Sequence, residues 1–135
     1  MDREQLMKEA VNIRAKAYVP YSEFPVGAAL LSRSGKLYTG CNIENSAYSV
    51  TCCAERVAIF KAISEGETEF TEMAVAADTK RPVPPCGACR QVMSEFFPKD
   101  MKIHLANIHG VSRTFAMEEL LPFSFQPDDL NDSGS

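Results

Sequence analysis

Two short segments contain the side chains from which a metal-dependent site could be built. The first is residues 85–89, where Cys86 and Cys89 are separated by two residues at the start of a predicted helix. Two sulfurs at this spacing can bind one metal ion, and the N–H groups at a helix N-terminus stabilise thiolates. This segment alone leaves three interpretations open: a metal site, a redox pair and two buried thiols.

The second segment favours the metal. Cys53 and Glu55 lie in the first turn of another predicted helix. A catalytic zinc ion takes three protein ligands and leaves one position to water, so Cys53 and the two cysteines of residues 85–89 could hold it. Glu55 could then accept a proton from that water. Two alternatives remain: the helix dipole favours an acidic residue in a first turn anyway, and the neighbouring Cys52 makes the choice of ligand ambiguous on spacing alone.

The hydrophobic pattern predicts an alternation of helices and strands to position these groups. Asp2 and Gln5 form a capping-box pattern at the start of an apolar helical stripe that Pro20 closes. The predicted elements are that helix, strands at 26–31 and 36–42, a helix at 53–65, a strand at 73–77, a helix at 89–97, strands at 102–106 and 112–116, and a helical turn at 118–121. Strands interleaved with helices indicate one sheet with helices on its faces, an α/β sandwich in a single domain of residues 1–135.

Composition and charge narrow the possible partners. The chain has 135 residues, 45% of them apolar and 24% charged, as in an ordinary soluble globular protein. A net charge of −4 argues against a nucleic acid polymer and favours a small, roughly neutral substrate. No apolar run approaches the roughly 20 residues that cross a bilayer, and the first residues lack a secretory pattern. Five cysteines cannot form a fully paired disulfide framework, so we expect a cytoplasmic protein without membrane contact.

Residues 21–29, 40–45, 53–56 and 85–91 together resemble the small homotetrameric cytidine deaminases of pyrimidine salvage. Cys-Ala-Glu at residues 53–55, followed by Pro-Cys-x-x-Cys at residues 85–89, is similar to the three-cysteine form of the zinc deaminase signature. The resemblance extends from the first predicted helix to Phe125. It implies a three-layer αβα sandwich around a mixed five-stranded sheet, one Zn²⁺ per subunit, and a homotetramer. The implied reaction is hydrolysis of cytidine and deoxycytidine to uridine and deoxyuridine with release of ammonia.

The resemblance also implies roles for individual residues. The matching positions are Cys53, Cys86 and Cys89 for the zinc ligands, Glu55 for the proton shuttle, Asn42 and Glu44 for the ribose hydroxyl, Phe24 for an aromatic side chain beside the substrate, and the Ala54 N–H for a donor to the pyrimidine carbonyl. Tyr48 and Phe125 match aromatic residues that reach a neighbouring subunit's site, although a single aromatic residue more commonly packs in its own core. Two positions depart from the family: Pro84, where a small polar residue is expected, and the extra thiol of Cys52.

The charge of the predicted site suggests a role for an arginine. Three thiolates around Zn²⁺ leave a net negative charge, which would weaken the effect of the metal on its water. Helix N-termini and a guanidinium group can draw charge from the sulfurs. We expect this of Arg56, with Arg90 as a second candidate and a solvated surface arginine as the alternative.

Two other functions compete with this interpretation. One is a deaminase of another substrate, such as a base within a polynucleotide or a nucleoside antibiotic. The acidic balance argues against polynucleotides, and Asn42 with Glu44 argues for a free nucleoside. A structural zinc module closes its site with four protein ligands, for which Cys52 or Cys41 would have to serve. His104 and His109 lack ligand spacing to the cysteines and are interpreted as structural, and Cys41 as a buried small side chain. Residues 126–135 are expected to form a loosely ordered tail.

Overall fold

Five strands form one mixed sheet. The computed structural model describes residues 1–131. The strands are β1 (Val26–Ser32), β2 (Leu37–Cys41), β3 (Phe70–Ala77), β4 (Lys102–Asn107) and β5 (Ser112–Ala116). They lie in the order β2-β1-β3-β4-β5. The strands β3 and β4 run parallel, and the other neighbours are antiparallel. The mixed five-stranded sheet that the family resemblance implies is confirmed.

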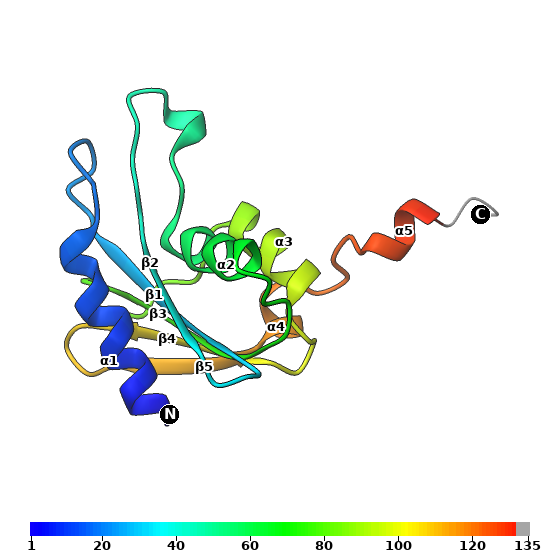
Figure 1. Ribbon diagram of the computed structural model, residues 1–135. Helices are drawn as coiled ribbons and strands as arrows, with labels where there is room; N and C mark the ends of the chain where they lie inside the picture. Colours follow the sequence, from blue (N-terminus) through cyan, green and yellow to red (C-terminus); the bar gives the residue numbers. More distant parts are fainter. Residues whose placement is uncertain (132–135) are drawn as a thin grey trace.

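Helices cover both faces of this sheet (Figure 1). On one face lies α1 (Arg3–Ile13), where Leu6 and Ala10 are buried against Ala29 and Ala74. On the other face lie α2 (Ala54–Ser64) and α3 (Gly87–Phe96). The second core includes Leu30, Ile59, Met73, Met93 and Ile103. Burial of these two apolar layers stabilises the predicted αβα sandwich.

The first helix is shorter than its apolar pattern. The predicted capping box is present, since Asp2 Oδ1 accepts the Gln5 N–H at 2.8 Å and Gln5 Oε1 accepts the Asp2 N–H at 3.2 Å. However, α1 ends at Ile13 and is followed by one 3₁₀ turn, η1 (Arg14–Lys16). The chain then becomes extended because Tyr18 pairs with Ile43 in a parallel β-bridge. This pairing connects the segment before β1 to the segment after β2.

The remaining short elements lie in the connections. The helix α4 (Met117–Leu120) matches the predicted helical turn, whereas η2 (Tyr48–Val50) and α5 (Pro127–Asn131) were not expected from the sequence. The segment after α4 leaves the body of the molecule and carries α5 away from the sheet (Figure 1). The last part of the expected tail, residues 132–135, lies outside the described residues.

The two cysteine segments meet near the carboxyl ends of the parallel strands β3 and β4. The carboxyl ends of β3 and β4 lie side by side, with Ala77 opposite Asn107. Asn107 is buried, and its side-chain amide donates to the carbonyls of Thr79 and Lys80 at 2.9 and 3.1 Å. These bonds fix the start of the loop that runs from β3 to α3. The carboxyl ends of parallel strands are a common place for ligands to bind in α/β sheets.

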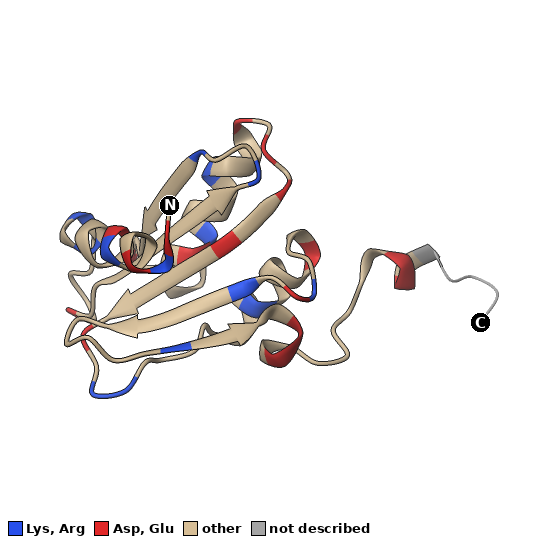
Figure 2. Cartoon of the chain, turned by 90° about the horizontal axis from the view of Figure 1, so that it is seen from below, with Lys and Arg blue, Asp and Glu red and all other residues tan. Residues whose placement is uncertain are grey.

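Charged residues of both signs are mixed along the chain (Figure 2). Basic and acidic residues alternate along α1 and recur on the strands and loops. A phosphate backbone is bound by clustered Lys and Arg, which is a different distribution. Within residues 1–131, no helix has the length and apolar character required to cross a membrane.

Candidate active site

Both predicted cysteine segments start a helix, and the two starts face each other. Cys53 is the N-cap of α2 and Cys86 is the N-cap of α3. The Cys86 sulfur accepts the backbone N–H of Cys89 at 3.4 Å and lies 3.8 Å from the Cys53 sulfur. The three sulfurs all lie within 4.8 Å of one another. The structure therefore brings together the three residues that the sequence predicts as metal ligands.

The two remaining cysteines lie outside this group. Cys52 pairs through its backbone with Ile43, and burial raises the pKa of its thiol. Cys41 is buried at the end of β2, as predicted. In the part of the chain that the structure describes, the metal-ligating group consists of three thiols and has no fourth protein ligand. This arrangement favours a site with an open position over a closed structural zinc module.

Arg56 supplies positive charge to the sulfurs. One guanidinium nitrogen donates to the Cys53 sulfur and to the Thr51 carbonyl, both at 3.4 Å. Hydrogen bonds from Cys89 and Arg56 lower the pKa of the Cys53 thiol to about 5, whereas donation to Cys53 and burial raise the pKa of Cys89. The Arg56 Nε is buried without a hydrogen-bond partner among the described residues. Burial of a polar atom without a hydrogen-bond partner is unfavourable. The position of Arg56 is explained if the neighbouring sulfurs are thiolates around a metal such as zinc, which attract its positive charge.

Arg90 does not share this position. Its Nε donates to the Pro85 carbonyl at 2.8 Å, and a terminal nitrogen donates to the Leu120 carbonyl at 2.7 Å. Within residues 1–131, none of its hydrogen bonds reaches a sulfur. The expectation that Arg90 draws charge from the thiolates is therefore not supported. Arg90 instead ties the loop before Cys86 to the end of α4.

Glu55 is a buried carboxylic acid beside the thiols. Its exposed fraction is 4%, and burial raises its pKa to about 7. A group with a pKa near neutrality can both accept and return a proton. The preceding residue, Ala54, is fully buried at the first position of α2, where a backbone N–H has no carbonyl within its own helix.

A cavity of about 250 Å³ joins these groups. Its lining includes Phe24, Asn42, Cys53, Ala54, Glu55 and Cys86. Pro84 and Val83 also line it, so the departure from the family at Pro84 adds apolar surface to the wall. The cavity combines a metal-ligating edge, a buried acid and an aromatic side chain in one place.

A second cavity of about 370 Å³ adjoins the first through Thr51, which lines both. It is lined by Tyr21, Ser22, Glu44 and Tyr48 in addition to Thr51. The Tyr48 ring meets the edge of the Tyr21 ring at a centroid distance of 6.1 Å. The predicted sugar-binding pair is thus split, with Asn42 on the first cavity and Glu44 on the second.

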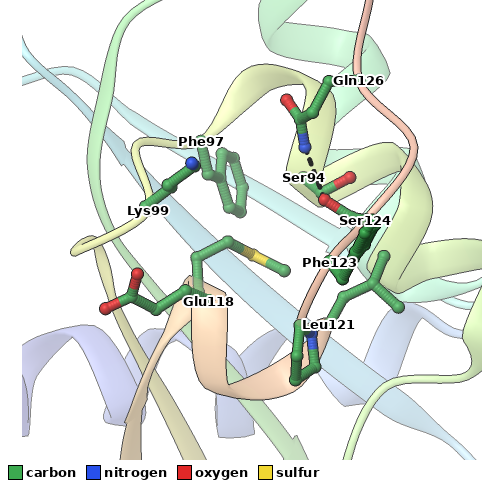
Figure 3. Close-up of a pocket in the computed structure, with 10 residues that line it drawn as sticks. Ser94, Phe97, Lys99, Glu118, Leu121, Phe123, Ser124 and Gln126 are labelled. Atoms are coloured by element: carbon green, nitrogen blue, oxygen red, sulfur yellow. Dashed lines mark hydrogen bonds between the residues drawn. The ribbon is translucent and has the colours of Figure 1, made fainter. Parts of the chain in front are cut away.

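A larger cavity of about 440 Å³ lies between α3, α4 and the segment that follows α4 (Figure 3). Phe97, Leu121 and Phe123 form much of its wall, and Lys99 and Glu118 are its charged groups. Its lining contains no cysteine and no group of metal ligands. We therefore assign the chemistry to the smaller cavity beside the thiols.

The two aromatic residues that match residues reaching a neighbouring subunit lie outside the core of their own chain. Tyr48 has an exposed fraction of 76% and Phe125 of 56%. The Phe125 carbonyl accepts a hydrogen bond from Gln91 at 2.9 Å, but Phe125 does not line the cavity beside the thiols. The alternative that both rings pack in their own core is wrong, because each presents much of its surface outward.

The two histidines have partners away from the thiols. His104 is buried on β4, where its ring nitrogens bond Glu72 at 2.6 Å and Thr114 at 2.8 Å. His109 pairs with Asp78 at 3.0 Å. These contacts agree with the structural interpretation of both residues.

Sequence reasoning missed the contributions of Thr51 and Ser22. Thr51 lines both cavities, and Ser22 donates a hydrogen bond to Glu44 in the lining of the second. The sequence separation of Ser22 and Glu44 is 22 residues, which no local periodicity relates. The available signal was the position of Ser22 inside the stretch 21–29, which carries the family resemblance.

Comparisons with known proteins agree with this geometry. Residues 1–105 match the family model described as the cytidine and deoxycytidylate deaminase zinc-binding region. A cytidine deaminase of Halalkalibacterium halodurans is 56% identical over 132 residues, covering 98% of this chain and 100% of the relative. A cytidine deaminase of Sporosarcina psychrophila is 54% identical, covering 97% and 96%. The crystal structure of cytidine deaminase from Burkholderia pseudomallei has a TM-score of 0.90 and 44% identity, covering 93% of this chain and 100% of that chain.

The family model and the relatives show that the chain is a zinc-dependent hydrolase, and the buried acid beside three clustered thiols fits that class. The chain belongs to the cytidine and deoxycytidylate deaminase family.

Proposed function

We propose that this chain hydrolyses cytidine and deoxycytidine to uridine and deoxyuridine with release of ammonia. The observation that carries the proposal is the position of Glu55, buried in the same cavity as Cys53 and Cys86. The names of the relatives and of the solved structure support the substrate. The cavity also contains an aromatic side chain, Phe24, of the kind that packs against a pyrimidine ring.

Cys53, Cys86 and Cys89 would hold the zinc ion. Bound there, zinc would lower the pKa of a water molecule and so supply the nucleophile at neutral pH. Glu55 takes the proton from the attacking water and delivers a proton to ring atom N3 as the oxygen bonds to C4. Glu55 then takes the remaining proton from the oxygen on C4 and delivers it to the amino group, so that the C4–N bond breaks, the C4 carbonyl forms and ammonia leaves. A pKa of about 7 suits both directions of proton transfer.

The polar groups around the two cavities would orient the nucleoside. We assign the backbone N–H of Ala54 to the pyrimidine carbonyl, and Asn42 and Glu44 to the sugar hydroxyl. The Asn42 side chain already accepts the Val26 N–H and donates to the Phe24 carbonyl, both at 2.9 Å. These bonds support the assignment because they leave one N–H and one oxygen lone pair of the amide for a ligand.

Neighbouring copies would complete the site. We propose a homotetramer in which Tyr48 and Phe125 contact substrate bound to an adjacent subunit. Their exposure supports this arrangement, as does the exposure of Phe123 (96%) and Leu130 (77%) on the segment that leaves the body of the molecule. Large apolar side chains gathered on one projecting segment are typical of subunit contacts. The five free thiols support a reducing, cytoplasmic location.

Ammonia release from cytidine, from deoxycytidine and from free cytosine tests the proposed function. We expect turnover of cytidine and very poor turnover of cytosine, because the base lacks the hydroxyl that Asn42 and Glu44 would bind. Replacing Glu44 with Ala should raise KM for cytidine. Efficient deamination of the free base would contradict the assigned sugar contacts, and no ammonia from any nucleoside would contradict the proposed reaction.

A further inference from the structure

The carboxylate of Glu44 is held by the loop before β1. Its Oε1 accepts the backbone N–H groups of Tyr21 and Ser22 at 3.0 and 3.1 Å. Its Oε2 accepts the hydroxyl proton of Ser22. These hydrogen bonds, the one from the Ser22 hydroxyl above all, lower the pKa of Glu44. An ionised carboxylate only accepts hydrogen bonds, so a sugar hydroxyl that meets Glu44 must be the donor.

These contacts determine which part of the carboxylate can meet a ligand. A carboxylate has about four acceptor positions, two on each oxygen. Tyr21 and Ser22 fill both positions of Oε1, and the Ser22 hydroxyl fills one position of Oε2. Among residues 1–131, no further group donates to this carboxylate. One acceptor position of Oε2 therefore remains, and the Ser22 hydroxyl fixes its direction.

The same hydroxyl is also bonded to the segment that carries Phe24. The backbone N–H of Phe24 donates to Ser22 Oγ at 3.1 Å. The intervening residue, Glu23, has φ = 54°, in the left-handed region that non-glycine residues rarely adopt. Such a backbone persists only where surrounding contacts hold it. The Ser22 hydroxyl supplies two such contacts. One is to Glu44, which lines the second cavity, and the other is to the backbone of Phe24, which lines the first.

We propose that Ser22 is a positioning residue for the nucleoside: its hydroxyl orients the Glu44 carboxylate toward the sugar and fixes the Phe24 backbone beside the base. The proposal rests on the proposed function, because it assumes that Glu44 binds the sugar. Ser22 itself acts through Glu44 and Phe24. Its effect therefore falls on substrate binding and leaves the proton transfers at Glu55 unchanged.

A double-mutant cycle on Ser22 and Glu44 tests the proposal. We expect Ser22→Ala to raise KM for cytidine about tenfold, the size of one lost hydrogen bond, with kcat within about twofold. In a Glu44→Ala background, the same change should raise KM by a smaller factor than in the native chain, because only the contact to the Phe24 backbone is then lost. Ser22→Thr keeps a hydroxyl and should stay within about threefold of the native KM.

A matched control comes from the other end of the same hairpin. Ser34 lies in the turn between β1 and β2, and its hydroxyl donates to Glu67 at 2.8 Å. Ser34→Ala breaks another serine–glutamate hydrogen bond and should leave KM for cytidine unchanged. Zinc content and circular dichroism of each variant show whether the fold is retained.

Each contrary outcome has a separate meaning. An equal rise in KM with and without Glu44 would overturn the proposal, since Ser22 would then act without orienting Glu44. Loss of zinc or of the folded state in Ser22→Ala would also overturn it, because the hydroxyl would then hold the fold and not the substrate. Failure of the proposed function is seen differently: the native chain would release no ammonia from cytidine.

Discussion

Arg56 and Glu55 are adjacent in sequence and burial disfavours the charge of both, yet only Arg56 has a partner that holds its charge. The Arg56 guanidinium keeps its charge because it donates to the Cys53 sulfur, which raises its pKa. Glu55 lies in an apolar setting that favours the neutral acid, so its pKa rises to about 7. One residue thus provides a fixed positive charge and the other a proton that can be exchanged, as acid–base catalysis beside a metal requires.

The assignment of the metal ligands predicts a sharp contrast among the cysteines. Replacing Cys53, Cys86 or Cys89 with Ala should abolish zinc binding and lower stability, because ligation and folding are coupled. Replacing Cys41 or Cys52 with Ser should leave one zinc ion per chain. Metal analysis of the purified variants provides the measurement. A Cys52 variant without zinc, together with a Cys53 variant that retains it, would reverse the assignment.

The proposed proton shuttle predicts a separation of binding from turnover. Glu55→Gln keeps the size of the side chain but removes its exchangeable proton. We expect the fold and the zinc content to be retained and kcat for cytidine to fall by at least about 10²- to 10⁴-fold, the usual contribution of a general acid–base. Steady-state kinetics beside metal analysis measures both. Turnover close to that of the native chain would exclude Glu55 from the mechanism.

At the scale of helices and strands, close packing of α2 against β2 sets the position of Glu55. A Cβ atom on Gly40 would lie 2.5 Å from the Ala54 carbonyl oxygen and 2.5 Å from the Ala58 nitrogen. Both neighbours are backbone atoms of α2, so a larger residue would displace the helix itself. The absence of a side chain at Gly40 lets the first turn of α2 lie directly on the strand.

This contact predicts that Gly40→Ala is destabilising. Overpacking of this kind costs typically about 1–3 kcal/mol, and the shift of α2 should also lower kcat/KM for cytidine. Urea unfolding and steady-state kinetics give the two values. Gly87→Ala is the matched control, because a Cβ there meets no atom within 4 Å and should change stability little. Equal effects of the two substitutions would contradict the packing argument.

The sequence predicted the elements well where the pattern was local. The three main helices and the five strands lie close to their expected ranges, because their apolar spacing and caps are properties of short segments. The prediction was wrong at the end of α1, where pairing between Tyr18 and Ile43 replaces helix. It also missed η2, since the loop that carries Tyr48 has no apolar periodicity.

In the candidate site, too, features set by short local motifs could be predicted and features set by the fold could not. The ligand cysteines and Glu55 could be predicted because each occupies the first turn of a helix in a specific short motif. The hydrogen bonds of Glu44 could not, because Ser22 meets it through the fold, 22 positions away. Arg90 was misjudged for a related reason: its carbonyl partners, Pro85 and Leu120, are brought to α3 by loops whose course the sequence does not reveal.

At the scale of the whole molecule, the proposed homotetramer makes a prediction about mixed assemblies. A chain with Glu55→Gln lacks the proton shuttle, and a chain with Phe125→Ala lacks the aromatic side chain offered to a neighbour. If the sites are shared, mixing the two inactive or weakened chains should restore some activity, because hybrid assemblies contain sites with both residues. Ammonia release after mixing and re-assembly measures this.

Two results would contradict shared sites. Mixed chains with no more activity than the sum of the separate variants would show that each chain uses only its own residues. A fully active monomer in sedimentation at assay concentration would show that no neighbour is needed.

The wide spacing of the ligands along the chain has a thermodynamic consequence. Cys53 and Cys86 are 33 positions apart, and all of β3 lies between them. An ion bound to both closes a long loop, as a disulfide would, and such closure is entropically costly in an unfolded chain. In the folded chain the packing of α2 and α3 on the same face of the sheet already holds these cysteines together, so zinc binding closes no further loop. Zinc therefore binds the native state selectively, and the free zinc concentration enters the folding equilibrium by mass action.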